Sequence, residues 1–169
     1  MEIVMIPQER VSALIGQGGA TKKMLEERCG VKLRVSPEGE VEIKGSDAVA
    51  EWKTRDVVKA VGRGFSPHDA IKLLEEGYYL RIIDLDEVLG SRRRIERQKA
   101  RVIGKKGKAR MFIEEMSGAK VCVYGDTVSI IGQLDEVSLA EEAIMRLISG
   151  AEHSTIFNML ERARRKMQE

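Results

Sequence analysis

The sequence repeats itself, and this repeat limits the possible folds more than any other feature. Shifting the chain by 88 positions places ALIGQGGATK (residues 13–22) over RVIGKKGKAR (residues 101–110). The match continues past the glycines, where KKMLEERCGVKLRV (residues 22–35) lies over RMFIEEMSGAKVCV (residues 110–123). Repetition at a fixed interval indicates copies of one structural unit, and 169 residues are enough to bury two small cores. We therefore expect two modules with the same fold.

Each copy has the periodicity of the same six elements. An extended apolar run is followed by two short helices around the glycine loop, then by two alternating strands and a longer helix. Gly30 and Gly118 stand where a glycine commonly ends a helix. The expected strands are residues 2–7, 31–35 and 40–44 in the first copy and 78–85, 119–124 and 127–131 in the second. The predicted fold class is α+β, with two three-stranded sheets that each carry three helices on one face.

The sequence also predicts where the modules begin and end. The expected segments are module 1 at residues 1–64, a connecting helix at 65–77, module 2 at 78–150 and a C-terminal amphipathic helix at 151–169. The connecting segment is expected to be an ordered helix, because Ser66 suits an N-cap and Pro67 suits the first helical position.

Composition argues against several kinds of protein. The net charge is only +2, so the overall charge does not indicate a partner. The two cysteines and two histidines have no spacing typical of a zinc site, and we expect neither a metal nor a cofactor. The chain has no secretory signal and no apolar run near the roughly 18 residues of a membrane span, so we expect a cytoplasmic protein with no membrane partner. Aromatic residues make up only 4% of the chain, which argues against a reader that stacks bases on an aromatic sheet.

Positive charge is concentrated around the second glycine loop. From Arg92 to Arg110 the chain has ten basic residues and one acidic residue. Glycines let a phosphate approach the backbone closely because they have no Cβ, and the following helix N-terminus offers unpaired N–H groups. A basic stretch beside such a loop indicates a nucleic-acid backbone as the ligand. The first loop keeps its glycines but has no charge at Gln17 and Gly18.

Candidate RNA-binding residues lie in and next to the two loops. They are Arg101, Ile103, Gly104, Lys105, Lys106, Gly107, Lys108 and Arg110 in the second copy and Ile15, Gly16, Gln17, Gly18, Gly19, Lys22 and Lys23 in the first. An apolar groove beside the hairpin is expected to read the bases, and its candidate residues are Ile15, Leu33, Ile103, Ile113 and Val121. These five residues are equally well suited to the core, and the basic run also suits a solvated helix face.

A helix, a Gly-x-x-Gly loop, a second helix and a β-hairpin resemble, in this order, the type I KH domain, an RNA-binding module whose loop clamps the nucleic-acid backbone. The loop alone is a weak signal, but here it recurs between the same two elements. The segments 60–85, 92–132 and 150–167 are more specific, and they resemble the pre-ribosomal KH proteins of archaea and eukaryotes. These proteins include the partner-of-site-D-nuclease family. The chain lacks the long N-terminal extension of eukaryotic members and so resembles the archaeal form.

This resemblance implies two tandem type I KH modules in a factor for small-subunit rRNA maturation. It implies single-stranded RNA near the 3′ end of the small-subunit (16S-type) rRNA as the ligand. It also implies the α subunit of initiation factor two and other pre-ribosomal assembly factors as protein partners.

Three functions compete at this level. The leading one is a non-enzymatic RNA-binding assembly factor. The alternative is a protein-interaction scaffold of the translation or pre-ribosome machinery, with residual RNA binding in module 2. A nuclease would need a metal–carboxylate cluster, and the glutamate pairs 26–27 and 114–115 do not provide one, because adjacent residues on a helix do not face each other. We therefore predict no catalytic residue and no metal site.

Overall fold

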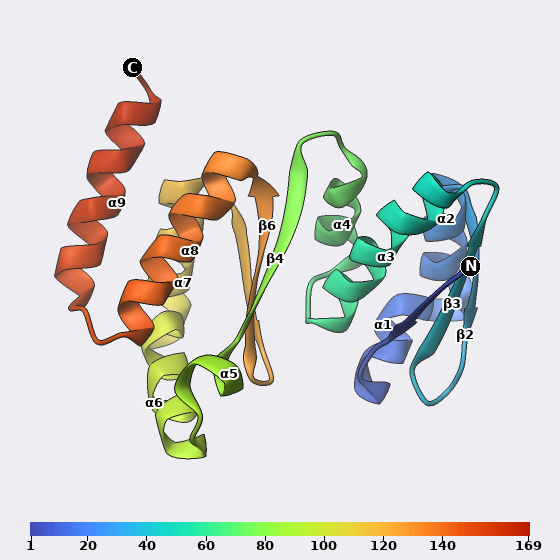
Figure 1. The fold of residues 1–169 in the computed structure, drawn as a ribbon, viewed down its shortest axis with the longest axis horizontal. Coiled ribbons are helices and arrows are strands. Elements are labelled where there is room, and N and C mark those ends of the chain that lie inside the picture. Colours follow the sequence, from blue (N-terminus) through green and yellow to red (C-terminus); the bar gives the residue numbers. More distant parts are fainter. The chain divides into compact units, whose positions relative to one another are not determined.

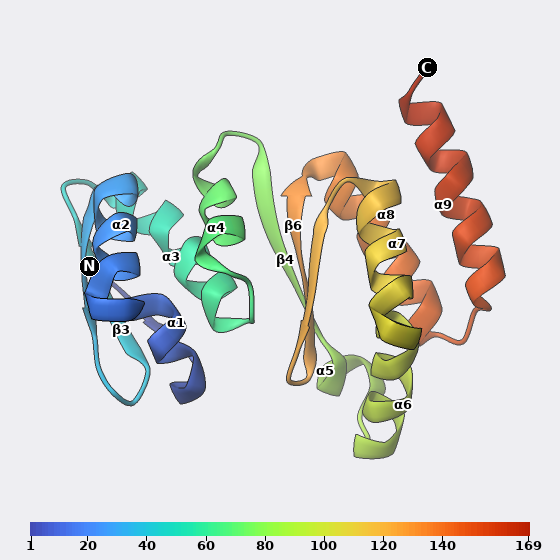
Figure 2. The same cartoon turned by 180° about the vertical axis from the view of Figure 1, so that it is seen from behind.

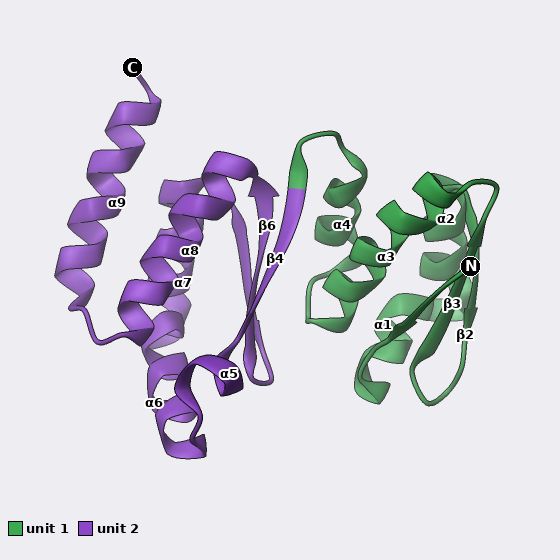
Figure 3. Ribbon diagram, viewed as in Figure 1, with its two compact units in different colours: residues 1–78 green, residues 79–169 purple.

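The chain divides into two compact units. The computed structural model describes all residues from 1 to 169, with unit 1 at residues 1–78 and unit 2 at residues 79–169 (Figure 3). Each unit has one three-stranded sheet and its own helices. The repeat in the sequence is therefore also a repeat in the structure, and the mixed α/β class predicted from the sequence is confirmed.

Unit 1 has the expected order of strand, helix, helix, strand, strand, helix. Its elements are β1 (Glu2–Met5), η1 (Gln8–Arg10), α1 (Val11–Ile15), η2 (Gln17–Gly19), α2 (Ala20–Cys29), β2 (Val31–Val35), β3 (Glu40–Gly45), α3 (Ala48–Gly62), α4 (Pro67–Ala70) and η3 (Ile71–Leu74). Strand β3 lies between β1 and β2 and pairs antiparallel with both. Val4 is opposite Val41 and Leu33 is opposite Ile43, and all four side chains are buried. The period-two pattern of the strands thus turns one face of the sheet toward the helices.

The segment after α3 forms a shorter helix than the sequence predicts. Ser66 accepts a hydrogen bond from the Asp69 N–H at 3.2 Å and Pro67 lies in the first turn, as expected from their positions. The α-helix nevertheless ends at Ala70, and the 3₁₀ helix η3 ends at Leu74. Ala70 and Leu73 are buried in unit 1, where α4 and η3 contact α3. This segment is therefore part of the packing of unit 1.

Unit 2 repeats the order of unit 1 and adds helices to it. Its elements are β4 (Tyr78–Asp84), α5 (Leu85–Leu89), α6 (Arg92–Ile103), η4 (Lys105–Gly107), α7 (Lys108–Ser117), β5 (Lys120–Tyr124), β6 (Thr127–Gln133), α8 (Leu134–Ile148) and α9 (His153–Met167). Strand β6 is central, with the order β4-β6-β5. The short helix α5 is not predicted from the sequence. It begins where the Asp84 carboxylate accepts a hydrogen bond from the Asp86 N–H at 3.0 Å.

The helices cover one face of the sheet in each unit (Figure 1). The fully buried side chains between these layers include Leu14, Leu25, Val41 and Ile43 in unit 1 and Ile95, Ile113, Ile130, Ile144 and Leu147 in unit 2. Helix α9 adds a further layer that lies beside α7 and α8 (Figures 1 and 2). Its Ile156 and Leu160 are fully buried, and burial of one such side chain contributes about 1.5–3 kcal/mol. Helix α9 is therefore an integral part of unit 2, whereas in unit 1 only the short helices α4 and η3 follow the long helix α3.

Candidate nucleic-acid interface

The first glycine of each loop is required by its surroundings. Gly16 and Gly104 both have φ of 75°, a region that residues with a Cβ seldom adopt. A Cβ on Gly104 would also lie 2.8 Å from the backbone nitrogen of Ala109, and one on Gly16 would lie 2.8 Å from the backbone nitrogen of Thr21. The chain can therefore turn this tightly from one helix into the next only with glycine at these positions.

The last glycine of each loop leaves the backbone open instead. Gly19 and Gly107 have φ of 78° and 76°, and a Cβ built on Gly19 would meet no atom within 4 Å. On Gly107 it would meet only a guanidinium nitrogen of Arg110, at 4.0 Å. The ten-residue helices α2 and α7 begin directly afterwards, and no side chain caps either N-terminus. Each loop therefore combines an accessible backbone with N–H groups suited to a phosphate.

Lys106 has an unusual backbone conformation. Its φ of 56° and ψ of 28° are left-handed, and it is the only residue other than glycine in the chain with a positive φ. The equivalent residue in unit 1 is Gly18, with φ of 62°. A left-handed conformation costs a residue with a Cβ roughly 1–2 kcal/mol relative to the right-handed one. Lysine at this strained position is therefore a candidate for a functional contact at the loop.

Three lysines give the second loop its charge. Lys105, Lys106 and Lys108 are exposed, and none of them forms an ion pair. Arg92, at the other end of the basic run, is paired: it donates two hydrogen bonds of 2.7 Å to the Asp126 carboxylate. These bonds lower the pKa of Asp126. Arg93, Arg97 and Lys99 on α6 also form no ion pair, so the unpaired positive charge extends from α6 to the loop.

Arg101 has a structural role that the sequence does not predict. Its guanidinium donates hydrogen bonds to the carbonyl oxygens of Leu147 and Ala151, at the end of α8 and just before α9. His153, the first residue of α9, contacts the backbone of the same residue, with Nε2 2.8 Å from the Arg101 carbonyl oxygen. Arg101 therefore joins α6 to the α8–α9 connection. Its side chain is engaged there and not at the open side of the loop.

Arg110 is also engaged within unit 2. It is half-buried, pairs with Glu114 at 2.7 Å and lies 3.4 Å from the carbonyl oxygen of Val121. The other carboxylate oxygen of Glu114 accepts the Val121 N–H at 2.8 Å, on the edge strand β5. In unit 1, Glu26 accepts the Leu33 N–H of the edge strand β2 in the same way, at 2.8 Å. Each unit thus uses a glutamate of its second helix to hold the edge strand.

The structure narrows the predicted apolar groove. Leu33, Ile113 and Val121 are 4%, 0% and 3% exposed, so these three candidates are core residues. Sequence periodicity cannot separate a groove from a core, because both require apolar side chains on one face. Ile15 and Ile103 are only half-buried, and both end the helix that precedes a glycine loop. They remain the candidates for contact with a ligand.

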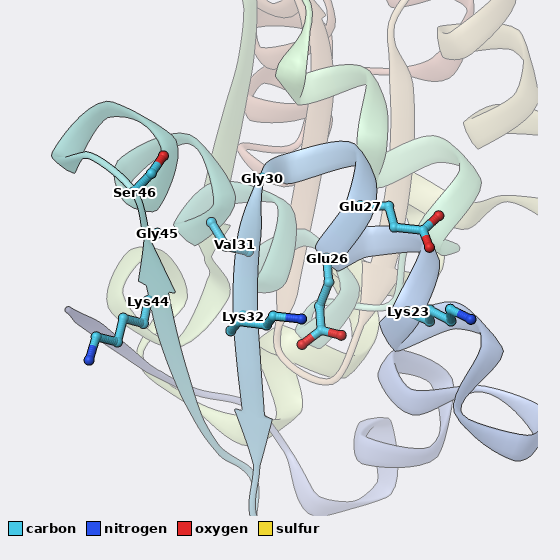
Figure 4. Close-up of a pocket in the computed structure, with 9 residues that line it drawn as sticks. All are labelled: Lys23, Glu26, Glu27, Gly30, Val31, Lys32, Lys44, Gly45 and Ser46. Carbon is cyan, nitrogen blue, oxygen red and sulfur yellow. The ribbon is translucent and has the colours of Figure 1, made fainter.

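Unit 1 has a pocket of mixed charge. It has a volume of about 570 Å³ and is lined by α2, β2 and β3, with three lysines (Lys23, Lys32 and Lys44) and two glutamates (Glu26 and Glu27). Figure 4 shows Lys32 and Glu26 close together between β2 and α2, whereas Lys44 extends away from them. Lys22 lines a neighbouring pocket with Glu26 and Glu42. Each of the two lysines expected to contact RNA in unit 1 therefore shares its pocket with carboxylates as well as with other cations, whereas no carboxylate lines the pocket beside the second loop.

Comparison with known proteins identifies the modules. Residues 79–165 match the model of a eukaryotic type KH domain (KH-domain type I) and residues 1–54 match the KH domain model. The chain is 45% identical to KH domain-containing protein MJ0443 of Methanocaldococcus jannaschii, over 99% of this chain and 76% of the relative. It is 30% identical to the pre-rRNA-processing protein pno1 of Aspergillus fumigatus, over 98% of this chain and 69% of the relative. The chain belongs to the Pno1/Dim2 family of KH-domain proteins.

A solved structure supports both KH modules. The complex of a/eIF2alpha, aDim2p and rRNA from Pyrococcus horikoshii contains a chain that matches with a TM-score of 0.91 and 45% identity, over 98% of this chain and 94% of that chain. The fold of two KH modules, which the resemblance implies, is thus confirmed. No helix of this family member is long and apolar enough to cross a membrane.

Proposed function

We propose that this KH protein is a non-enzymatic ribosome-assembly factor that binds single-stranded RNA near the 3′ end of small-subunit rRNA, mainly through module 2. The observation that carries the proposal is the second glycine loop. There Lys105, Lys106 and Lys108 are exposed and unpaired beside an open backbone and the uncapped N-terminus of α7. Relatives named as pre-rRNA-processing proteins support a role in ribosome assembly.

The ligand and the partner follow from the related complex. Its aDim2p is solved together with rRNA and a/eIF2alpha. We propose that this chain also binds rRNA and the α subunit of initiation factor two, and that it acts in the cytoplasm. Module 1, which we place at residues 1–64, then serves mainly for protein contacts.

A scaffold role for module 1 has its own support. Its loop has no charged side chain at Gln17 and Gly18. Several large apolar side chains of this unit are exposed, including Ile3 at 51%, Val49 at 61% and Trp52 at 62%. Exposed aromatic and aliphatic side chains are common in protein interfaces.

The test is a salt titration of RNA affinity. The purified chain is titrated with a single-stranded oligonucleotide from the 3′ end of small-subunit rRNA at increasing salt concentrations. We expect the logarithm of the affinity to fall linearly with the logarithm of the salt concentration, with a slope of about −0.7 per phosphate contacted. The same RNA incubated with Mg²⁺ and the chain is expected to stay intact. Loss of all binding near physiological salt, or cleavage, would refute the proposal.

A further inference from the structure

Unit 2 has a cavity directly beside its glycine loop. It has a volume of about 440 Å³ and separates the loop from α9. Two lysines of the loop region, Lys105 and Lys108, line it together with the small side chains of Ala100 and Ala109. Arg101 and Gly104 also line it, and the opposite wall comes from α9, with His153 and Phe157. The cavity therefore has basic groups on the side of the loop and aromatic rings on the side of the added helix.

The aromatic wall is held in place by its neighbours. The Phe157 ring packs against the ring of Phe112 on α7, with centroids 4.6 Å apart and planes tilted by 48°. His153 meets Phe157 edge-on, with centroids 5.8 Å apart. The carbonyl oxygen of Arg101 can only accept a hydrogen bond, so His153 Nε2, 2.8 Å away, must be the donor. A ring fixed in this way loses little conformational freedom when a ligand stacks on it.

The position of this wall depends on Arg101. Its hydrogen bonds to the carbonyl oxygens of Leu147 and Ala151 attach α6 to the segment that leads into α9. Ile156 and Leu160 then anchor α9 in the core. Helix α6 ends at the glycine loop. The Arg101 hydrogen bonds that attach α6 to the start of α9 therefore hold the first turn of α9 beside the loop.

We propose that this cavity binds one nucleobase of the RNA strand whose backbone lies on the second glycine loop, and this inference rests on the function proposed above. A nucleotide combines an anionic phosphate with a flat apolar ring, and the cavity offers a lysine rim and an aromatic wall at adjacent positions. Lys105 belongs both to the loop and to the rim, so a phosphate held there brings its own base to the cavity. Stacking on an aromatic side chain accepts any base, so the site contributes affinity rather than sequence selection.

Module 1 provides an internal comparison. Gln17 and Ala20 stand at the positions of Lys105 and Lys108, and α3 is followed only by the short helices α4 and η3, which pack on α3. The base site is therefore a property of module 2 alone. It also extends the RNA surface beyond the loop onto an element outside the six that the two modules share.

Two variants test the cavity while leaving the loop lysines unchanged. Ala100→Leu places a branched side chain in the cavity from an exposed position, so it removes no packing contact. Phe157→Leu keeps apolar bulk on α9 but removes the flat ring. The matched control is Asn158→Leu, on the exposed side of α9 and outside the cavity. All three are measured with the single-stranded rRNA 3′-end oligonucleotide, and thermal melts establish that each is folded.

Loss of one stacked base is expected to weaken affinity by roughly 5- to 150-fold, which corresponds to about 1–3 kcal/mol. We expect this loss in both cavity variants and none in Asn158→Leu. If Phe157→Leu fails to fold, Ala100→Leu alone still tests whether the cavity binds a base. Wild-type affinity in a folded Ala100→Leu protein would overturn the base site.

A set of oligonucleotides with one abasic position each identifies the base. One abasic position should weaken binding to the wild type, and the same change should cost nothing further in Ala100→Leu, because that base no longer enters the cavity. Additive losses at every position would overturn the inference. A wild-type protein that binds no RNA overturns both this inference and the proposed function, whereas RNA binding that is unaffected by the cavity variants overturns the base site alone.

Discussion

The two glycine loops have nearly the same backbone and different chemistry. Gly16 and Gly104 have φ of 75°, and the last glycines, Gly19 and Gly107, differ by only 2°. The residues between them are Gln17 and Gly18 in module 1 and Lys105 and Lys106 in module 2. The module with the charge also tolerates a strained lysine where the other has an unstrained glycine. The backbone of the loop therefore belongs to the KH fold, and the two modules differ in the side chains that they place on it.

In a second comparison the two modules make the same contact with residues from different positions of the repeat. Helices α3 and α8 occupy equivalent positions, and each has an arginine bound to its C-terminal end. In module 1, Arg10 Nε donates to the Val61 carbonyl oxygen at 2.9 Å and Nη2 donates to that of Phe65 at 3.0 Å. In module 2, Arg101 binds the equivalent carbonyl oxygens of Leu147 and Ala151. The arginines are not equivalent in the repeat, yet they satisfy the same pair of backbone acceptors.

The largest expected effect on RNA affinity comes from reversing the charge of the second loop. In Lys105→Asp/Lys106→Asp, two attractive charges are lost and two repulsive ones appear beside the phosphate, so we expect RNA affinity to fall roughly a hundredfold or more. The salt slope should flatten by about 1.4, since two phosphate contacts are lost. Thermal stability should change little, because both side chains are exposed. The measurement is the salt titration of RNA affinity with parallel melts.

The matched control for this change is Gln17→Asp/Gly18→Asp in module 1. Asp is among the residues that tolerate the left-handed conformation of Gly18, and parallel melts measure the strain that this change adds and Lys106→Asp does not. We expect a loss of affinity below tenfold, since Gln17 and Gly18 have no positive charge to lose. Equal losses of affinity in the two double variants would refute the proposal that RNA binds mainly through module 2.

The next effect is on stability, and it comes from removing Arg10 or Arg101, which bind the C-terminal ends of α3 and α8. Hydrogen bonds from a charged group contribute about 1.5–3 kcal/mol, and removal of the donor leaves carbonyl groups without partners. We expect Arg10→Ala and Arg101→Ala each to lower the free energy of unfolding by about this amount, measured by denaturant titration. Arg101→Ala should also lower RNA affinity by displacing α9, whereas Arg10→Ala should not. Unchanged stability in both variants would mean that these contacts are not maintained in solution.

A smaller effect distinguishes the two glycines of one loop. Gly104→Ala combines a left-handed strain of roughly 1–2 kcal/mol with a collision at the Ala109 backbone, whereas Gly107→Ala has the strain alone. Denaturant titration should therefore show the larger destabilisation for Gly104→Ala. RNA affinity should show the opposite order among folded variants, because a methyl group on Gly107 covers the open backbone. Gly16→Ala and Gly19→Ala should repeat the order of stabilities in module 1.

The sequence predicts the parts of this molecule that depend on local pattern. The period-two strands and the glycine positions are set by near neighbours along the chain. Together with the repeat they predict two α+β modules, and the order of elements in each resembles the KH domain. The cavity beside α9 is not predictable in this way. It depends on Arg101 reaching residues 46 and 50 positions further along the chain, and an arginine in a basic run has the same sequence signature whether it meets RNA or a carbonyl group. Leu33, Ile113 and Val121 illustrate the same limit, since burial and groove lining require the same residue type.

The smallest expected effect compares one surface carboxylate in each module. Hydrogen bonds from the Gly45 N–H and the Met1 ammonium lower the pKa of Glu51, and the two bonds from Arg92 lower the pKa of Asp126. A carboxylate with a lowered pKa stabilises the folded state above its ordinary pKa, near 4, and the contribution is lost as the pH falls through the folded value. We therefore expect Glu51→Gln and Asp126→Asn to melt slightly below the wild type at pH 7. At pH values well below 4 the difference should disappear, because the wild-type carboxylates are then protonated as well. Both groups are near the surface, so high salt should reduce the difference at pH 7, and more for Asp126, whose partner is a full charge, than for Glu51, whose first partner is a backbone amide. If a variant still melts below the wild type in acid, the replaced side chain acts through packing rather than through its charge.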